Sequence, residues 1–445
     1  MTSPGGEGPP AFSEAEIVEP SFREALAYWF KLGWINFGGP AGQIALMHRD
    51  LVDRRRWIDE RRFLASLDVC MLLPGPEAQQ LATHIGWRLH GVRGGLAAGA
   101  CFVLPSVAIL LALSWIYATW DDVAAVVAVL GGIKPIVVAI IVAALFRIAQ
   151  RSLRTPLHAV FAIAALVAIA WLGVPFPAIV AGAAVLGLLA GRFAPDLFVV
   201  PRHGAENEAM PGARPPVEEA PRRRGAALSL LVAGIVLWIL PAAVLLAAGD
   251  GAGRLSEVYL FFTKAAFVTF GGAYAVLAYV AEHAVASEWL TAEATIDGLA
   301  LAETTPGPLI IVLQFVGFLA GWNEPGALSP LVAAVVAALV TSWATFLPST
   351  LLGLLTAPYA ERLDRLQAAR AALGAVTAAV VGVIASLGLF LAREVFAPAA
   401  AGGVDWIAVA AAAAGVVALV RLRVEAHWAI AGGALLGLLR LGLGF

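Results

Sequence analysis

Lysine is rare in this chain, and two of its three lysines stand at matching places. Lys31 and Lys264 each lie in a long apolar stretch, and each is followed six residues later by Phe-Gly-Gly. A charge at the centre of a bilayer costs at least about 2.5–3.5 kcal/mol, so a lysine at both places indicates a use. We expect two cations beside an anion site. The alternative is that the amines reach the interface from helix ends, and for Lys134 both interpretations are equally open.

Two kinds of break interrupt the apolar stretches, and each kind occurs twice. Proline lacks an N–H group and glycine lets the backbone turn. Backbone groups freed inside lipid are tolerated only when they are buried in protein or line a cavity, and half-helices that meet there can direct an N-terminus at an anion. The alternative is a plain kink that serves helix packing. The breaks are Gly38-Gly39, Gly271-Gly272, Pro74-Gly75-Pro76 and Pro306-Gly307-Pro308.

Carboxyl, amide and hydroxyl side chains accompany these breaks. Glu77 follows the first Pro-Gly-Pro and Glu303 precedes the second, so the two are not at equivalent positions. Each carboxyl group could exchange protons during transport or neutralise a neighbouring cation. Uncharged donors suit a partly dehydrated oxyanion, although hydrogen bonding between helices would explain them equally well. The uncharged candidates are Asn36, Gln79, Gln80, Thr83, His84, Thr269, Thr304, Thr305 and Gln314.

Motifs of soluble enzymes are missing from the sequence. It contains no phosphate-binding loop, no HExxH and no cysteine or histidine cluster with ligand spacing. Cys70 and Cys101 lie in apolar segments and are expected to be small buried hydrophobes. The net charge of −2 gives no indication of a nucleic-acid partner. We therefore expect neither an enzyme nor a bound cofactor or metal.

The composition predicts a membrane protein. The chain is 60% hydrophobic and only 13% charged, whereas a soluble domain is about 25% charged. We expect a disordered tail at 1–20, which lacks the pattern of a signal peptide, and a linker rich in proline, glycine and charge at 192–224. The apolar segments are 22–47, 63–87, 94–118, 124–146, 158–173, 178–191, 225–248, 256–281, 298–321, 328–357, 371–392, 406–420 and 428–443.

The two halves of the chain repeat one another. Besides the lysines and both kinds of break, Trp57 matches Trp289 and Leu-Pro-Ser at 104–106 matches Leu-Pro-Ser at 347–349. The offset grows from 232 or 233 to 243, which predicts an insertion near 322–330. Repeats at 21–191 and 255–445 each hold six segments, and one connecting helix lies at 225–254. Six segments return the chain to the side of the membrane where it began, and the connecting helix then crosses once. The second repeat therefore starts on the opposite side and is inverted, as in many secondary transporters.

Loop charges agree with the inversion. The stretch 48–62 holds six arginines, whereas its counterpart at 282–297 holds four acidic residues and no lysine or arginine. Because basic loops favour the cytoplasm, the linker is expected there too. Keeping 48–62 and 147–157 both cytoplasmic requires re-entrant hairpins at the breaks, and full crossings remain the other interpretation. The arginines at 54–56 are best explained as a topology signal, with an electrostatic funnel for anions as the alternative.

These residues also resemble a known family. The stretches NFGGPAGQIALMHRDLVDRRRWIDERRFLASLDVCMLLPGPEAQQ and FVTFGGAYAVLAYVAEHAVASEWLTAEATIDGLALAETTPGP are similar to the two signature regions of the chromate ion transporter (CHR) family, in its long-chain form. The resemblance implies a carrier of the bacterial inner membrane that exports chromate, a tetrahedral dianion, and so confers resistance. Its motif positions here include Phe37, Pro40, Trp57, Gln80, Phe270 and Trp289 as well as both kinds of break. Ala273 stands where the first repeat has Pro40, which puts strict symmetry in doubt.

We therefore expect an all-α polytopic membrane protein of two inverted repeats, with broken or re-entrant helices and a site between the two kinds of break. One repeat would rock against the other to alternate access. A carrier or channel for sulfate or another oxyanion is the alternative, and a membrane lipid phosphatase is the least favoured one. Direction, coupling to protons or a counter-anion, and a homodimer all stay open.

Overall fold

The described part of the chain is helical throughout in this computed structural model. It covers residues 17–120, 122–193, 224–247, 249, 253–270, 272–360, 367–398 and 403–443, and contains no strand. Six of its helices are long and apolar enough to cross a membrane, and five shorter ones are apolar. The protein is therefore an all-α polytopic membrane protein, which confirms the expected fold class. Most of the expected tail and linker, and Gly271, lie outside the described residues.

Helices of the first half follow the predicted segments. The segment 22–47 is broken into two helices. Ser21 and Glu24 cap the N-terminus of the first helix with reciprocal hydrogen bonds. The segment 63–87 is likewise broken at Pro-Gly-Pro. The helices are α1 (Phe22–Ile35), α2 (Gly39–His48), a π-helix η1 (Arg49–Arg54), α3 (Glu60–Leu72), α4 (Glu77–Trp120), α5 (Ala124–Ser152), α6 (Pro156–Ala170), α7 (Phe176–Phe193) and then α9 (Arg224–Ala247).

The second half shows the same order of elements. The predicted segments 256–281 and 298–321 are again each broken into two helices. The elements are α10 (Gly253–Val268), α11 (Ala273–Ala286), α12 (Ala292–Glu303), η4 (Leu309–Ile311), α13 (Val312–Asn323), α14 (Pro330–Thr356), η5 (Ala357–Tyr359), α16 (Gln367–Phe396), α17 (Trp406–Val420) and α18 (Ala426–Gly442).

The long helix α4 is two helices joined at a sharp bend. His90 and Gly91 leave the helical conformation, with φ values of −141° and 61°. The bend falls between the predicted segments 63–87 and 94–118. In the second half the equivalent helices α13 and α14 are separated by residues 324–329, where the change of offset predicted an insertion.

The chain reverses direction at the breaks of the first half. Val18, just before α1, donates its N–H to the carbonyl of Arg56, which follows α2 and η1 (2.9 Å). The His90 ring, at the bend of α4, is 3.0 Å from the carbonyl of Pro20. The start of α1, the end of η1 and the bend of α4 therefore meet at one end. We call residues 22–90 the first double hairpin, this end its base, and the end with both breaks its tip.

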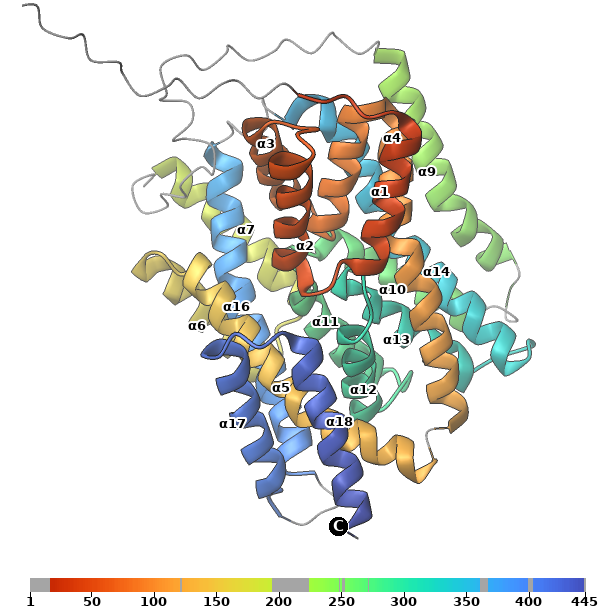
Figure 1. Ribbon diagram of the computed structural model, residues 1–445, viewed down its shortest axis with the longest axis vertical. Helices are drawn as coiled ribbons and strands as arrows, with labels where there is room; N and C mark the ends of the chain where they lie inside the picture. The colour runs from red at the N-terminus through yellow and green to blue at the C-terminus, as the bar shows by residue number, and fades with distance from the viewer. Residues whose placement is uncertain are drawn as a thin grey trace, which may run out of the picture.

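Residues 253–323 form a second double hairpin in the same way. Arg254, at the start of α10, pairs with Glu324 after α13, and its guanidinium lies 6.0 Å from the ring centre of Trp289, in the α11–α12 connection. Asn323 donates to the carbonyl of Trp289 (2.9 Å). In Figure 1 the second double hairpin lies below the first.

The two bases are built alike in detail. Arg56 and Glu288, 232 positions apart, are both non-glycine residues with a φ of 56°. Each precedes a tryptophan that meets an aromatic ring edge-on: Tyr28 lies 5.5 Å from Trp57, and Phe261 lies 5.4 Å from Trp289.

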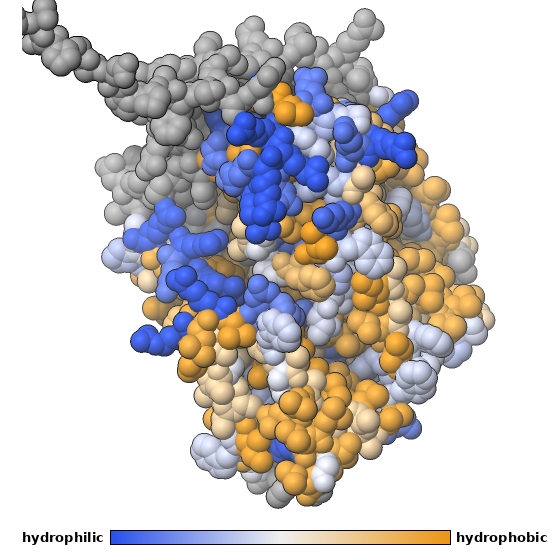
Figure 2. All heavy atoms as spheres, in the orientation of Figure 1, coloured by the Kyte–Doolittle hydropathy of each residue, from blue (hydrophilic) through white to orange (hydrophobic). Residues whose placement is uncertain are grey.

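Hairpins at the ends of each half pack on helices of the other half. The α6–α7 pair packs against α16, and the α17–α18 pair packs against α5. Small residues allow this, since a Cβ on Gly437 would lie 1.8 Å from the carbonyl oxygen of Ala128. Figure 2 shows hydrophilic side chains over the upper end of α2 and α3, and hydrophobic ones over the lower helices α17 and α18.

Candidate functional site

The tips of the two double hairpins meet through a pair of equivalent hydrogen bonds. Gly75 donates its N–H to the carbonyl of Thr269 (2.8 Å), and Gly307 donates its N–H to the carbonyl of Asn36 (3.3 Å). Gly75 and Gly307 hold the same place in their repeats, and so do Asn36 and Thr269. Each Pro-Gly-Pro break therefore touches the Phe-Gly-Gly break of the other repeat. We call this meeting point the junction.

The junction requires glycine at both Pro-Gly-Pro breaks. Gly75 and Gly307 have φ values of +118° and +115°, a region that favours glycine. A Cβ would also lie 2.8 Å from the Ser349 hydroxyl at Gly75, and 2.5 Å from Ser106 at Gly307. Ser106 and Ser349 are themselves the matching serines of the two Leu-Pro-Ser motifs, so this contact is exchanged between the repeats as well.

A glutamine that the sequence analysis did not single out holds the junction together. The buried Gln43 amide donates to the carbonyl of Asn36 (2.9 Å) and to that of Gly307 (2.5 Å). Gln80, one of the predicted candidates, donates to the carbonyl of Pro74 (2.7 Å). The signal for Gln43 was present, because it is a polar residue four positions after Gly39 in an apolar segment.

Several polar atoms of the junction are buried without a partner. Both polar atoms of the Asn36 side chain, and the oxygens of Gln43 and Gln80, make no hydrogen bond within the described residues. A buried polar group without a hydrogen bond costs about 1–3 kcal/mol, so each such group needs an explanation. Water would donate to the three oxygens, and a ligand oxygen or water would accept from the Asn36 nitrogen.

Two helix N-termini open at the junction. α2 begins after Gly38 and α11 begins after Gly272, and neither first turn is capped by a side chain. The first N–H groups of a helix have no partner within it, and the helix dipole places a partial positive charge there. Such ends bind anions readily.

The two carboxyl groups near the breaks differ in their surroundings. Glu303 accepts a hydrogen bond from the Tyr274 hydroxyl (2.7 Å). Glu77 begins α4 and is partly buried.

The two matching lysines lie on outward faces of their helices. Lys31 on α1 and Lys264 on α10 are both exposed, and neither makes an ion pair within the described residues. Each lies five residues before the junction residue of its own helix end, Asn36 or Thr269. The third lysine, Lys134, is instead mostly buried in ion pairs with Glu293 and Asp297.

Several of the predicted polar candidates bond to other helices or to their own. Gln79 and Ser349 share a hydrogen bond of 2.9 Å, and the His84 ring lies 3.0 Å from the Thr356 hydroxyl. Gln314 donates to the carbonyl of Val107 (2.9 Å). The hydroxyl groups of Thr83, Thr269, Thr304 and Thr305 donate to carbonyls of their own helices. These side chains use their donors within the protein, and Thr269 takes part in the junction through its backbone carbonyl.

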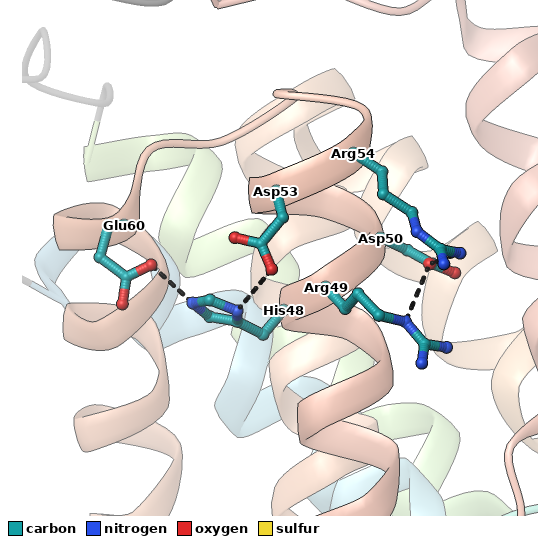
Figure 3. A network of polar contacts seen from close by, with 6 residues as sticks. All are labelled: His48, Arg49, Asp50, Asp53, Arg54 and Glu60. Carbon is teal, nitrogen blue, oxygen red and sulfur yellow. Dashed lines mark hydrogen bonds and ion pairs between the residues drawn. The ribbon is translucent and has the colours of Figure 1, made fainter. Parts of the chain in front are cut away.

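The arginine-rich stretch lies at the base of the first double hairpin, away from the junction. Figure 3 shows His48 between Glu60 and Asp53, with ring-to-carboxylate distances of 2.5 and 3.6 Å. Arg49 and Arg54 both reach Asp50 on the neighbouring face. The network ties η1 to the start of α3, and among the described residues no group of three or more His, Cys, Asp or Glu could hold a metal.

Broken helices that meet at a buried polar junction are a feature of membrane transporters. The chain belongs to the chromate transporter family, whose model matches residues 23–188 and 256–438. It is 32% identical to a chromate transport protein of Pseudomonas aeruginosa over 390 residues, 86% of this chain and 84% of that protein. The protein is thus a transporter and not an enzyme.

Two further relatives cover a similar share of the chain. A chromate transport protein of Cupriavidus metallidurans is 29% identical over 84% of this chain and 83% of its own length. A probable chromate transport protein of Synechococcus elongatus is 28% identical over 84% and 85%. No solved structure matches the chain.

Proposed function

We propose that this protein is a secondary carrier that exports chromate across the bacterial inner membrane. Its family supports the substrate, because the matching family model and the relatives are described as chromate transporters. The observation that carries a binding site is the junction, where the unpartnered Asn36 amide nitrogen and two uncapped helix N-termini lie together.

The chemistry of the junction suits a tetrahedral dianion. The Asn36 amide nitrogen and the first N–H groups of α2 and α11 are donors that need an acceptor, and an oxyanion offers four oxygens. Charge-assisted hydrogen bonds of this kind are about twice as strong as neutral ones. The proposed site comprises the two kinds of break, including Gly38, Gly39, Gly271 and Gly272, with Asn36, Glu77, Gln80, Thr269 and Glu303. In this proposal Lys31 and Lys264 attract the anion from the helix faces rather than contact it.

The exchanged contacts support two inverted repeats. When position i of one copy contacts position j of the other, a two-fold axis requires that j also contacts i. The Gly75–Thr269 and Gly307–Asn36 bonds satisfy this rule. With both double hairpins turning back, the basic base of the first lies in the cytoplasm and the acidic base of the second lies outside. Rocking of one double hairpin against the other would open the junction to each side in turn.

Export is favoured by the membrane potential. A cell that is negative inside assists the exit of an anion by about 2.3 kcal/mol per charge per 100 mV. A dianion therefore gains twice that amount, so a carrier of this kind protects a cell without hydrolysing ATP.

Radiolabelled chromate flux into inside-out vesicles tests the proposal. The protein should drive chromate uptake that saturates and that a positive-inside potential accelerates. Replacing Lys31 and Lys264 with alanine should lower the rate at low salt and have less effect at high salt, because exposed charges are screened. Lys31→Arg is the matched control. Sulfate uptake at an equal rate would favour a general oxyanion carrier, and no chromate uptake would refute the proposal.

A further inference from the structure

A cavity of about 760 Å³ lies outside the junction, where α5, α12, α16 and α18 come together. Its ionisable lining is mostly acidic. Asp122, Glu293, Glu394 and Asp405 line it, against two basic residues, Lys134 and Arg440. Glu293 belongs to the acidic stretch 282–297 at the base of the second double hairpin, so in the proposed topology the cavity opens on the outer side.

A buried ion pair lies at the wall of this cavity. The Lys134 ammonium is 3.4 Å from Oδ1 of Asp297 and 2.5 Å from Oε1 of Glu293. The Asp297 side chain is only 4% exposed, and its other oxygen accepts a hydrogen bond from the Tyr117 hydroxyl (3.1 Å). Glu293 is open to the cavity, with its side chain 72% exposed. Lys134 therefore connects one buried and one exposed carboxylate.

The side chains that form this ion pair have no counterparts in the other repeat. At the offsets of the surrounding motifs, Lys134 corresponds to Thr377, Asp297 to Ala65 and Tyr117 to Ala360. The two backbone bonds of the junction join equivalent positions of both repeats, whereas the ion pair exists on one side only. An ion that binds at this unmatched pair therefore acts on the two halves differently.

The charges of Lys134, Asp297 and Glu293 determine which kind of ion can bind among them. One ammonium and two carboxylates sum to a net negative charge, so a dianion is repelled. A metal cation would need several oxygen ligands, and no suitable group of three or more ligands exists among the described residues. A proton needs only one carboxylate and a path to water. Building on the proposed function, we propose that Asp297 and Lys134 form the site at which this carrier binds a proton in exchange for chromate.

Proton binding and release at this site need no reactant other than water. A proton from water in the cavity passes to Glu293 and then, through the Lys134 ammonium, to Asp297, which becomes a neutral carboxylic acid. Lys134 then pairs with Glu293 alone, so one of the two ion pairs between α5 and α12 is lost and their packing loosens. Release of the proton on the other side restores the carboxylate and the ion pair. Inward movement of a proton and outward movement of a dianion are both driven by a potential that is negative inside.

Other charged groups near Asp297 are few. Glu394 of α16, Arg440 of α18 and Asp405 before α17 line the same cavity, and Arg440 is paired with Asp405 (3.0 Å). α11, which also packs on α12, carries Glu282 and His283 near its end, and α13 carries no charged residue. Among these, Asp297 is the buried carboxylate in contact with Lys134.

Proteoliposomes that contain a pH-sensitive dye test the inference, with chromate flux measured in the same vesicles. Wild-type protein should move protons against chromate, and Asp297→Asn should move chromate without a proton signal and without pH dependence. Glu394→Gln, at an exposed position of the same cavity, should keep wild-type coupling. The double variant Lys134→Gln with Asp297→Asn removes both charges of the pair. Its proton signal and chromate flux are measured instead if the single variant does not fold.

Each result decides a separate point. A proton signal of wild-type size in Asp297→Asn or in the double variant overturns the inference. Chromate flux without protons in the wild type also overturns it but leaves the proposed function intact. A wild type that moves no chromate refutes the proposed function itself.

Discussion

The backbone N–H of Gly75 donates a hydrogen bond to the carbonyl of Thr269 over 2.8 Å, and so ties the two halves of the chain together at the junction. Residues 194 apart in sequence are joined by main-chain atoms alone. The bond between Gly307 and Asn36 repeats it with the halves exchanged. The junction is thus held by backbone bonds on both sides.

Replacing Gly75 with alanine should strain this junction. A left-handed conformation costs a non-glycine residue about 1–2 kcal/mol, and overpacking adds about 1–3 kcal/mol. The new methyl group would lie 2.8 Å from the Ser349 hydroxyl. We expect a lower unfolding temperature in detergent and a loss of chromate flux. Gly131→Ala is the control, because Gly131 is helical and has nothing within 4 Å of its Cβ position. Equal unfolding temperatures for both variants would contradict the strain.

Opposite orientation of the repeats can be measured at two equivalent positions. Arg54 and Ala286, 232 residues apart, are both exposed at the bases of their double hairpins. A single cysteine at Arg54 should react with an impermeant maleimide only in inside-out vesicles, and one at Ala286 only in intact cells. The background needs Cys70 and Cys101 replaced by alanine, and of these only Cys70 is fully buried. Labelling of both positions from the same side would exclude inversion.

The repeat and its breaks could be predicted because glycine, proline and lysine are individually conspicuous in apolar sequence. Phe-Gly-Gly and Pro-Gly-Pro mark the places where α1, α3, α10 and α12 end. Loop charges suggested that the chain turns back there, and the contacts of Val18 with Arg56 and of Pro20 with His90 show that turn. What the sequence could not give was which repeat each break touches, since partners hundreds of residues apart leave no local pattern.

The site itself was predicted only in part. Asn36 and the glycines are at the junction, but Gln43 was missed because its partners are backbone carbonyls, one of them in the other repeat. Lys31 and Lys264 were singled out for their charge, yet the helix phase that places them on outward faces depends on packing. For Lys134 both interpretations stayed open, because its partner Asp297 lies 163 residues away.

Close packing of α18 on α5 should depend on a single glycine. A Cβ at Gly437 would lie 1.8 Å from the carbonyl oxygen of Ala128, which is backbone and cannot move aside cheaply. Gly437→Ala should therefore destabilise the protein by about 1–3 kcal/mol. Gly432→Ala, on the same helix, is the matched control because nothing lies within 4 Å of its Cβ position. Thermal unfolding in detergent compares them, and a neutral Gly437→Ala would refute the contact.

Asn36 gives the most direct test of the junction as a binding site. Its side-chain atoms have no partner within the described residues, so Asn36→Ala should not lower the free energy of unfolding. A hydrogen bond to a charged ligand is worth about 1.5–3 kcal/mol, so the same change should weaken chromate transport at least about tenfold. Asn36→Asp should abolish it, because a carboxylate at that position repels a dianion. Ser114→Ala, which removes a buried hydroxyl bonded within α4, should leave transport unchanged. If Asn36→Ala transports chromate at the wild-type rate, the ligand does not bind at this asparagine.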